Sequence, residues 1–283
     1  AWKGERVNAQ AVLWSNKELK DITLSVSDLR SGYSVIPSSS VTTNFVRYVM
    51  TDELNKNGKG GCGPRPNKAD WDSSLVAAVL DAKLRHDIDA MTVQPLWLNL
   101  DVPREIAAGK YRGTLTVSAA GVTPMQLHIE LEVVNRTLPE PKDWAFHLDL
   151  WQNPYAVARY YNVPLWSDEH FNAMRPIMKQ LANAGQKIIT ASIMYKPWAG
   201  QTEDAFDSMV FQMKKLDGSW EYDYTVFDKW VEFMISMGVD KQINCFTLVP
   251  WELKFDYFDQ ATNRVQFIKA KPGEPAYTDY WYN

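Results

Sequence analysis

The spacing of hydrophobic residues changes around residues 135–153, and this change constrains the fold more than any other feature. Before it, short segments alternate apolar and polar residues, as half-buried β-strands do. After it come longer blocks, each a buried strand followed by an amphipathic helix, which is the pattern of a parallel sheet. The segment between them, Asn135 to Trp144, carries Pro139 and Pro141 and predicts a stiff connection. We therefore predict two domains, at 1–138 and 145–283, joined by a linker at 139–144.

Length and charge exclude several classes of protein. The 283 residues suffice for two hydrophobic cores. The net charge of −4 leaves no basic surplus to neutralise phosphates, so we expect no nucleic-acid partner. No apolar run approaches the roughly 20 residues of a membrane helix, so we expect no membrane span. The chain begins with Ala1 rather than Met and shows no signal peptide, from which we expect that an upstream segment was removed.

The first domain is predicted to be a β-sandwich. Residues 111–118 alternate apolar and polar, and residues 127–133 alternate again after a turn at 120–124, which indicates a hairpin with one buried face. Further strands are expected at 22–26, 45–49 and 95–100. Many short strands separated by Pro/Gly turns are typical of a sandwich.

Nothing in the sequence indicates a nucleotide, a flavin or a catalytic metal, and we predict no cofactor. The glycine-rich loop at 55–66 lacks the phosphate-loop pattern, because Lys59 is followed by glycine rather than Ser or Thr. Cys62 and His147 have no partner at metal-ligand spacing. Cys62 and Cys245 lie on opposite sides of the linker, and we expect no disulfide between them.

The second domain is predicted to alternate strands and helices. The first helix begins at the N-cap Ser167 and ends at Gly185, with a kink at Pro176. Its apolar stripe is expected to comprise Phe171, Met174, Ile177, Met178, Leu181 and Ala184. The elements that follow are, in chain order, a strand at 187–193, a hairpin at 209–222 that turns at Asp217-Gly218, a helix over Phe227–Met237 ended by Gly238, a strand at 242–248, a hairpin at 253–270, and a helix capped by Thr278 or Asp279.

With a first strand at 145–154, this pattern gives about three βα units. Parallel sheets of this kind close as barrels of eight units, and three strands alone would leave an open edge and an uncovered face. We therefore predict the first units of a (β/α)8 TIM barrel that is incomplete in this chain. The alternative is a small complete α/β domain.

Polar and aromatic residues follow the predicted strands, where a barrel carries its site. They are Asp149, Trp151, Gln152 and Asn153 after the first strand, Tyr195 and Trp198 after the second, and Trp251 and Glu252 after the third. The carboxyl ends of parallel strands meet at one rim. Acids and amides suit sugar hydroxyls, and indoles suit the flat faces of sugar rings, so we predict a carbohydrate site. The alternatives are structural: a salt bridge for Asp149, a core position for Trp251, and a solvated loop for Glu252.

Several stretches resemble the N-terminal part of a family-123 glycoside hydrolase. They are Ala1–Arg6, Cys62–Arg65, Pro95–Leu98, Gly109–Val117, Leu148–Pro154, Tyr222–Tyr224 and Val249–Trp251. The resemblance implies a β-sandwich before a (β/α)8 barrel. It further implies a bacterial, secreted or periplasmic/cell-surface exo-β-N-acetylgalactosaminidase that acts on a glycan or glycolipid and retains configuration by a substrate-assisted mechanism.

In that family an Asp-Glu pair at the end of the fourth barrel strand is catalytic. The dipeptides Asp52-Glu53 and Asp168-Glu169 do not fit, because the first lies in the sandwich and the second opens a helix. We therefore assign no catalytic residue within the chain, expect the pair beyond Asn283, and expect the chain alone to be inactive. Two alternatives stay open: a non-catalytic carbohydrate-binding protein, and a two-carboxylate glycosidase that uses Asp149 and Glu252.

Overall fold

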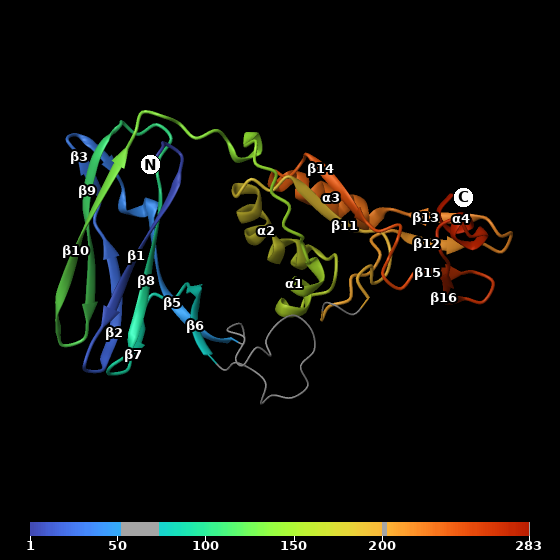
Figure 1. Ribbon diagram of the computed structural model, residues 1–283, viewed down its shortest axis with the longest axis horizontal. Coiled ribbons are helices and arrows are strands. Elements are labelled where there is room, and N and C mark those ends of the chain that lie inside the picture. The colour runs from blue at the N-terminus through green and yellow to red at the C-terminus, as the bar shows by residue number, and fades with distance from the viewer. Residues whose placement is uncertain (52–73, 200–202, 283) are drawn as a thin grey trace. The chain divides into compact units, whose positions relative to one another are not determined.

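The computed structural model describes residues 1–51, 74–199 and 203–282, which divide into two compact units, Ala1–Leu138 and Pro139–Asn283 (Figure 1). The structure groups residues 139–144, predicted as a linker, with the second unit. The Asp52-Glu53 dipeptide, the loop at 55–66 and Cys62 lie outside the described residues. None of the described helices is both long and apolar enough to cross a membrane.

The first unit consists of two sheets whose strands pair antiparallel. One sheet has the order β1 (Arg6–Trp14), β8 (Val93–Asp101), β5 (Val41–Thr51), β6 (Ser74–Asp81). The other has the order β4 (Ser34–Ile36), β3 (Leu29–Ser31), β9 (Gly109–Ala119), β2 (Leu19–Val26), β7 (His86–Ile88). β10 (Val122–Val133), which is outside this order, pairs antiparallel with β9. The short 3-10 helix η1 (Ser38–Ser40) precedes β5. The predicted hairpin and the three further strands are confirmed.

The core of the first unit lies between these sheets. Side chains from both layers meet there, namely Phe45, Leu96 and Leu98 from one and Ile22, Leu115 and Val117 from the other. Burying a side chain of this size contributes about 1.5–3 kcal/mol. Tyr111 is fully buried, and its hydroxyl bonds Ser34 Oγ and the Ala107 carbonyl, both at 2.7 Å.

The second unit combines helices with two small sheets. Its elements are η4 (Pro141–Asp143), α1 (Pro154–Tyr161), α2 (Asp168–Asn183), β11 (Ile188–Ser192), β12 (Phe211–Lys214), β13 (Trp220–Asp223), α3 (Thr225–Met237), β14 (Gln242–Phe246), β15 (Lys254–Asp259), β16 (Arg264–Lys269) and α4 (Pro275–Tyr282). β11 and β14 pair in parallel. The second sheet, which we call the hairpin sheet, has the order β13-β12-β15-β16 and joins the two predicted hairpins through a parallel β12–β15 contact.

Local chemistry explains where the helices begin and end. The Ser167 hydroxyl accepts a bond from the His170 amide at 3.2 Å and caps α2. Gly185 follows α2 at φ +88°, where an added Cβ would lie 2.8 Å from the Trp144 ring. α2 runs uninterrupted through Pro176. The predicted burial of Ile177 is wrong, since its side chain is 50% exposed.

The last helix begins earlier than predicted. α4 starts at Pro275 and not at Thr278 or Asp279. Proline suits the first helical turn because its missing N–H would have no partner there anyway and its φ is already helical.

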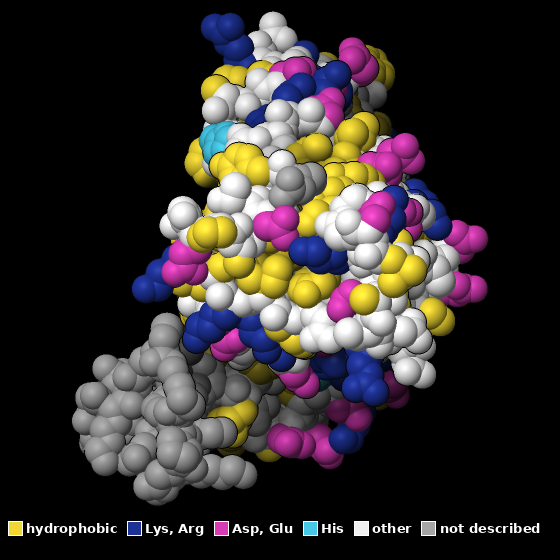
Figure 2. Space-filling view, turned by 90° about the vertical axis from the view of Figure 1, so that its right-hand side faces the viewer, with side chains coloured by type: hydrophobic (Ala, Val, Ile, Leu, Met, Phe, Trp, Pro, Cys, Tyr) yellow, Lys and Arg dark blue, Asp and Glu magenta, His cyan; other side chains and the backbone are white. Residues whose placement is uncertain are grey.

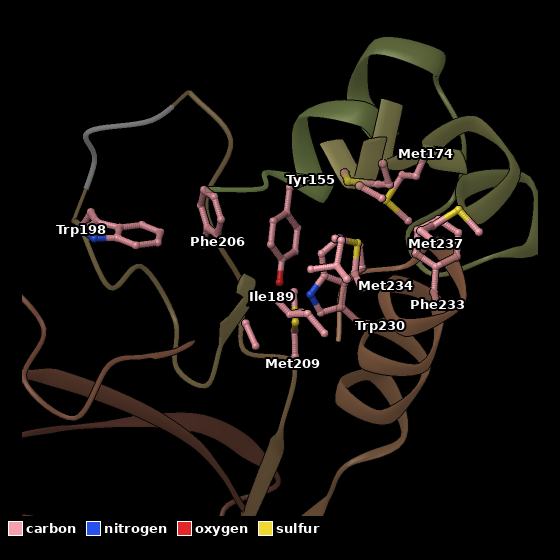
Figure 3. Packing of buried hydrophobic residues seen from close by; sticks show 14 residues of the cluster. Tyr155, Met174, Ile189, Trp198, Phe206, Met209, Trp230, Phe233, Met234 and Met237 are labelled. Atoms are coloured by element: carbon pink, nitrogen blue, oxygen red, sulfur yellow. The ribbon is translucent and has the colours of Figure 1, made fainter. Parts of the chain in front are cut away.

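The largest core of the second unit packs α2 and α3 on one face of β11 (Figure 3). Met174 and Met178 from α2 meet Met234 and Met237 from α3 in this core. Trp230 is fully buried among them, and its indole Nε1 donates to the Thr190 carbonyl at 2.9 Å.

The predicted first strand at 145–154 is wrong as a regular strand. Only Leu148 bridges to Gln186, in parallel, before β11. Beyond that bridge the amides of two glutamine side chains replace the backbone ladder. Gln186 Oε1 accepts the Leu150 amide at 3.0 Å, and Gln152 Oε1 accepts the Thr190 amide at 2.8 Å.

The donor ends of the same glutamines complete the connection. Gln186 Nε2 donates to the Ile188 carbonyl at 2.7 Å and to the Leu150 carbonyl at 3.1 Å. Gln152 Nε2 donates to the same two carbonyls. We call residues 148–152 the glutamine-joined segment, because two glutamine side chains make most of the bonds that hold it to residues 186–190. The main chain adds one bond, from the Lys187 amide to the Leu148 carbonyl at 3.0 Å.

Candidate functional site

An aromatic platform forms where the glutamine-joined segment, the loop after β11 and the end of β14 come together. The Trp151 ring stacks on Trp198 with centroids 5.0 Å apart and planes at 22°, and its centroid also lies 5.0 Å from that of Phe246. Trp198 is 9% exposed and belongs to the core (Figure 3), whereas Trp151 is 58% exposed. The core therefore supports an indole of which more than half remains accessible to a ligand.

Asp149 precedes the platform and has an unmet hydrogen-bonding oxygen. Its Oδ2 accepts from Asn244 Nδ2 at 3.4 Å. Its Oδ1 is buried and has no hydrogen-bond partner in the described part of the chain. A buried acceptor without a partner costs free energy, and a ligand hydroxyl or amide N–H would satisfy it.

The two amides predicted as substrate contacts have structural roles instead. Gln152 is 2% exposed, and both ends of its amide bond the backbone around β11. Asn153 caps α1, with its Oδ1 accepting the Ala156 amide at 3.1 Å. Both residues are thereby committed to holding the segment that carries Trp151.

The remaining predicted site residues lie in the loops after β11 and β14. The Trp251 amide donates to the Pro197 carbonyl at 3.2 Å, which ties these two loops together. The Trp251 indole is 64% exposed, and Glu252 is exposed as well. Among residues 1–51, 74–199 and 203–282, no hydrogen bond or ring contact joins either side chain to the aromatic platform. The structure thus stacks Trp151 on Trp198, while Trp251 meets the loop that carries Trp198 through its main chain.

Asp256 on β15 is a candidate that the sequence did not single out. Its Oδ1 accepts the amide of Tyr195, a predicted site residue, at 3.3 Å. Burial raises the pKa of the Asp256 carboxyl, and the bond from Tyr195 lowers it in part. A carboxyl group with a raised pKa is better suited to donate a proton than an ordinary aspartate. In the sequence Asp256 is one polar residue of an alternating hairpin, so only its burial in the fold marks it out.

The described residues contain no group of three or more His, Cys, Asp or Glu side chains arranged to hold a metal ion. His147 is exposed. Cys245 is a free, exposed cysteine whose pKa is raised by the burial of its thiol.

Comparison with known protein families identifies the chain. A family sequence model described as "Glycoside hydrolase 123, catalytic domain" matches residues 151–283, and one described as "Glycoside hydrolase 123 N-terminal domain" matches residues 1–119. The chain belongs to glycoside hydrolase family 123. The first match begins at Trp151, so the exposed indole of the aromatic platform lies within the family's catalytic domain.

A solved structure agrees with this assignment. A family 123 glycoside hydrolase from Clostridium perfringens, solved for the details of glycolipid glycan hydrolysis, matches 99% of this family-123 chain with a TM-score of 0.90 and 27% identity. The chain spans about half of that enzyme, 48% of its length. A PapD-like domain of human CEP192 matches 48% of the chain and 77% of itself, with a TM-score of 0.22 and 10% identity, which supports no inference. No curated protein matches the chain.

Proposed function

We propose that the full-length protein is an exo-acting glycoside hydrolase that removes a terminal β-linked N-acetylhexosamine, N-acetylgalactosamine, from a glycan or glycolipid. Membership in family 123 supports the reaction class. The observation that carries the substrate class is the aromatic platform, whose accessible Trp151 indole lies two residues along the chain from Asp149, a carboxylate with one oxygen that has no partner among the described residues. The similar enzyme from Clostridium perfringens, solved in the context of glycolipid glycan hydrolysis, supports the same class.

The proposed mechanism is substrate-assisted. The acetamido oxygen of the sugar forms a bond to the anomeric carbon while the bond from that carbon to the leaving oxygen breaks. An Asp orients the acetamido group, and the adjacent Glu gives its proton to the leaving oxygen. Water then attacks the anomeric carbon from the face that the leaving group vacated and gives a proton to the Glu, while the bond from that carbon to the acetamido oxygen breaks, so configuration is retained. We propose that this Asp-Glu pair follows Asn283 in the full-length protein.

Residues of this chain would bind and orient the sugar. Trp151 would hold the apolar face of the ring, and Trp198 would fix the Trp151 indole from beneath. The free Oδ1 of Asp149 would accept a bond from a hydroxyl or from the acetamido N–H. In this proposal the glutamine-joined segment, β11 and β14 are the first three strands of a (β/α)8 barrel. The enzyme would work in a secreted or cell-surface location, where glycans are met.

Hydrolysis of aryl N-acetyl-β-galactosaminide and N-acetyl-β-glucosaminide, by this chain and by the full-length protein, tests the proposal. We expect activity only in the full-length protein and mainly on the galactosaminide. Trp151→Ala should lower kcat/KM at least about tenfold, which corresponds to about 1.4 kcal/mol of binding to the transition state. Trp14→Ala on β1 is the matched control, since that indole is also exposed but belongs to the first unit. Activity of this chain alone would contradict the assignment of the catalytic pair, and sugar binding without hydrolysis by either protein would favour a binding module.

A further inference from the structure

A pocket of the second unit lies between the hairpin sheet and α4, and Figure 2 views the end of the unit where these elements lie. Its volume is about 230 Å³. Four aromatic side chains, two aliphatic side chains and one amide line it, and those that matter here are Gln212 on β12, Tyr222 on β13, Tyr224, and Tyr280 and Trp281 on α4. We call it the hairpin pocket. None of the eight site residues predicted from the sequence lines it.

Two residues that line the hairpin pocket each carry a buried polar atom without a hydrogen-bond partner among the described residues. Gln212 is 6% exposed, and its Nε2 donates to the Ile193 carbonyl at 3.4 Å, yet its Oε1 has no hydrogen-bond partner among the described residues. The buried Nε1 of Trp281 likewise has none within the part of the chain that is described. An amide oxygen only accepts and an indole N–H only donates, so two residues that line the pocket carry one unmet acceptor and one unmet donor. Buried groups of this kind are rare unless something else completes them.

The chemistry of the lining selects the occupant. No charged side chain of the described residues lines the pocket, so a charged ligand would be desolvated without compensation. A hydroxyl group both donates and accepts hydrogen bonds, so hydroxyl groups can donate to Gln212 Oε1 and accept from Trp281 Nε1. Four aromatic rings offer flat apolar faces of the kind that pack on the C–H faces of a sugar. The volume lies below the roughly 300–1,000 Å³ of pockets for drug-sized ligands and suits a single small ring.

We propose that the hairpin pocket binds one uncharged hexose ring and that this site is separate from the aromatic platform. Both sites lie near the carboxyl end of β11. The residue after that strand, Ile193, lines the pocket, and its amide donates to the carbonyl of the platform residue Phe246 at 2.7 Å. The pocket thus adds a second sugar-binding position to the same unit. Its occupancy does not depend on hydrolysis.

Titration of the full-length protein with methyl β-galactopyranoside and methyl β-glucopyranoside, followed by NMR of the indole N–H signals, tests this proposal. The Trp281→Phe variant assigns the Trp281 signal by its loss. We expect that signal to shift saturably with at least one of the two glycosides, and we expect Gln212→Met to weaken binding at least tenfold. Gln266→Met on β16 is the matched control and should leave the affinity unchanged. Galacturonate should bind at least tenfold more weakly than the neutral glycosides.

Three results would overturn the proposal. One is the absence of any saturable shift of the Trp281 signal in the unmodified protein, which needs no variant to fold. The second is an affinity, followed by the Trp281 signal, that is unchanged in Gln212→Met. The third is a structure of the full-length protein in which residues after Asn283 fill the pocket and bond Gln212 Oε1. Hydrolysis of the aryl galactosaminide is measured separately, and Trp151→Ala should leave the Trp281 shift intact, so failure of this site and failure of the proposed activity remain distinguishable.

Discussion

Replacement of Gln152 by leucine tests whether side-chain amides hold the glutamine-joined segment to β11. Leucine has a similar size but neither accepts nor donates a hydrogen bond. The Thr190 amide would lose its acceptor, since Gln152 Oε1 lies 2.8 Å from it. The Ile188 and Leu150 carbonyls would keep a donor, because Gln186 Nε2 bonds both. Only one buried group is therefore left without a partner.

The expected loss follows from that count. A buried N–H left without an acceptor costs about 1–3 kcal/mol, so Gln152→Leu should lower the free energy of unfolding of the second unit by about that amount. Gln152→Glu keeps an acceptor for the Thr190 amide. When the introduced carboxyl group is ionised, however, its second oxygen faces the Leu150 and Ile188 carbonyl oxygens, which it repels. It should therefore be less stable than Gln152→Leu at pH 7, and it should recover stability at acidic pH, where the added carboxyl group is protonated.

Urea unfolding combined with hydrogen exchange at the Thr190 amide provides the assay. Exchange reports on the second unit directly, even if the two units unfold separately. Gln180→Leu on α2 is the control, because Gln180 is exposed and a surface substitution should stay within about 0.5 kcal/mol. Equal protection of the Thr190 amide in Gln152→Leu and in the unmodified protein would refute the bonding scheme.

Three further predictions concern the site and its surroundings. Trp151→Ala should weaken sugar binding about tenfold yet cost only about 0.5–1.5 kcal/mol of stability, because its ring is 58% exposed and mainly loses one stacked pair. Burial lowers the pKa of His170, so below about pH 6.5 the unfolded chain takes up a proton that the folded chain does not. Stability should therefore decrease as the pH is lowered, and His170→Gln should lack this loss. Burial raises the pKa of Asp256, so between about pH 3.9 and its folded-state pKa the folded chain holds a proton that the unfolded chain has lost, and stability decreases as the pH rises through this range. Asp256→Asn should therefore raise Tm at pH 7 and should not raise it below about pH 3.9.

Each of these has a matched comparison. Trp14→Ala, at an exposed indole of the first unit, should leave sugar binding unchanged, and an equal loss in both variants would remove the special role of the platform. His147→Gln, at an exposed position, should retain the acid-dependent drop in Tm. Glu232→Gln on the exposed side of α3 should not raise Tm at pH 7, and a rise equal to that of Asp256→Asn would show that net charge, not burial, is responsible.

The sequence predicted most elements whose boundaries depend on local chemistry. Asp217-Gly218 marks the first hairpin of the second unit, and Gly218 indeed takes φ +85°. Gly238 ends α3 at φ +106°. Such positions need a backbone conformation that few residues adopt, so they can be recognised without knowledge of tertiary contacts.

Elements that depend on distant partners were predicted less well. Residues 145–154 have the alternation of a strand, but side chains of Gln152 and Gln186 make most of their bonds, and alternation does not reveal which groups do the bonding. For the same reason, Gln152 and Asn153 resembled ligand contacts although they serve a strand and a helix cap. Trp151 stacks on Trp198 because two segments distant in sequence meet. The sequence predicted that both residues lie at one rim of the sheet, but not that their rings are in contact.

The glutamine-joined segment also has a consequence for the alignment of the chain along β11. A main-chain ladder repeats every two residues, so a slip of two restores all its bonds. Two amide side chains at Gln186 and Gln152 occur once each, and a slip of any length would leave the Thr190 amide unpaired. The same amides form hydrogen bonds with the Ile188 carbonyl and the Thr190 amide, which on an unpaired strand edge could pair with another chain. Two residues thus both fix a single alignment and discourage association through this edge.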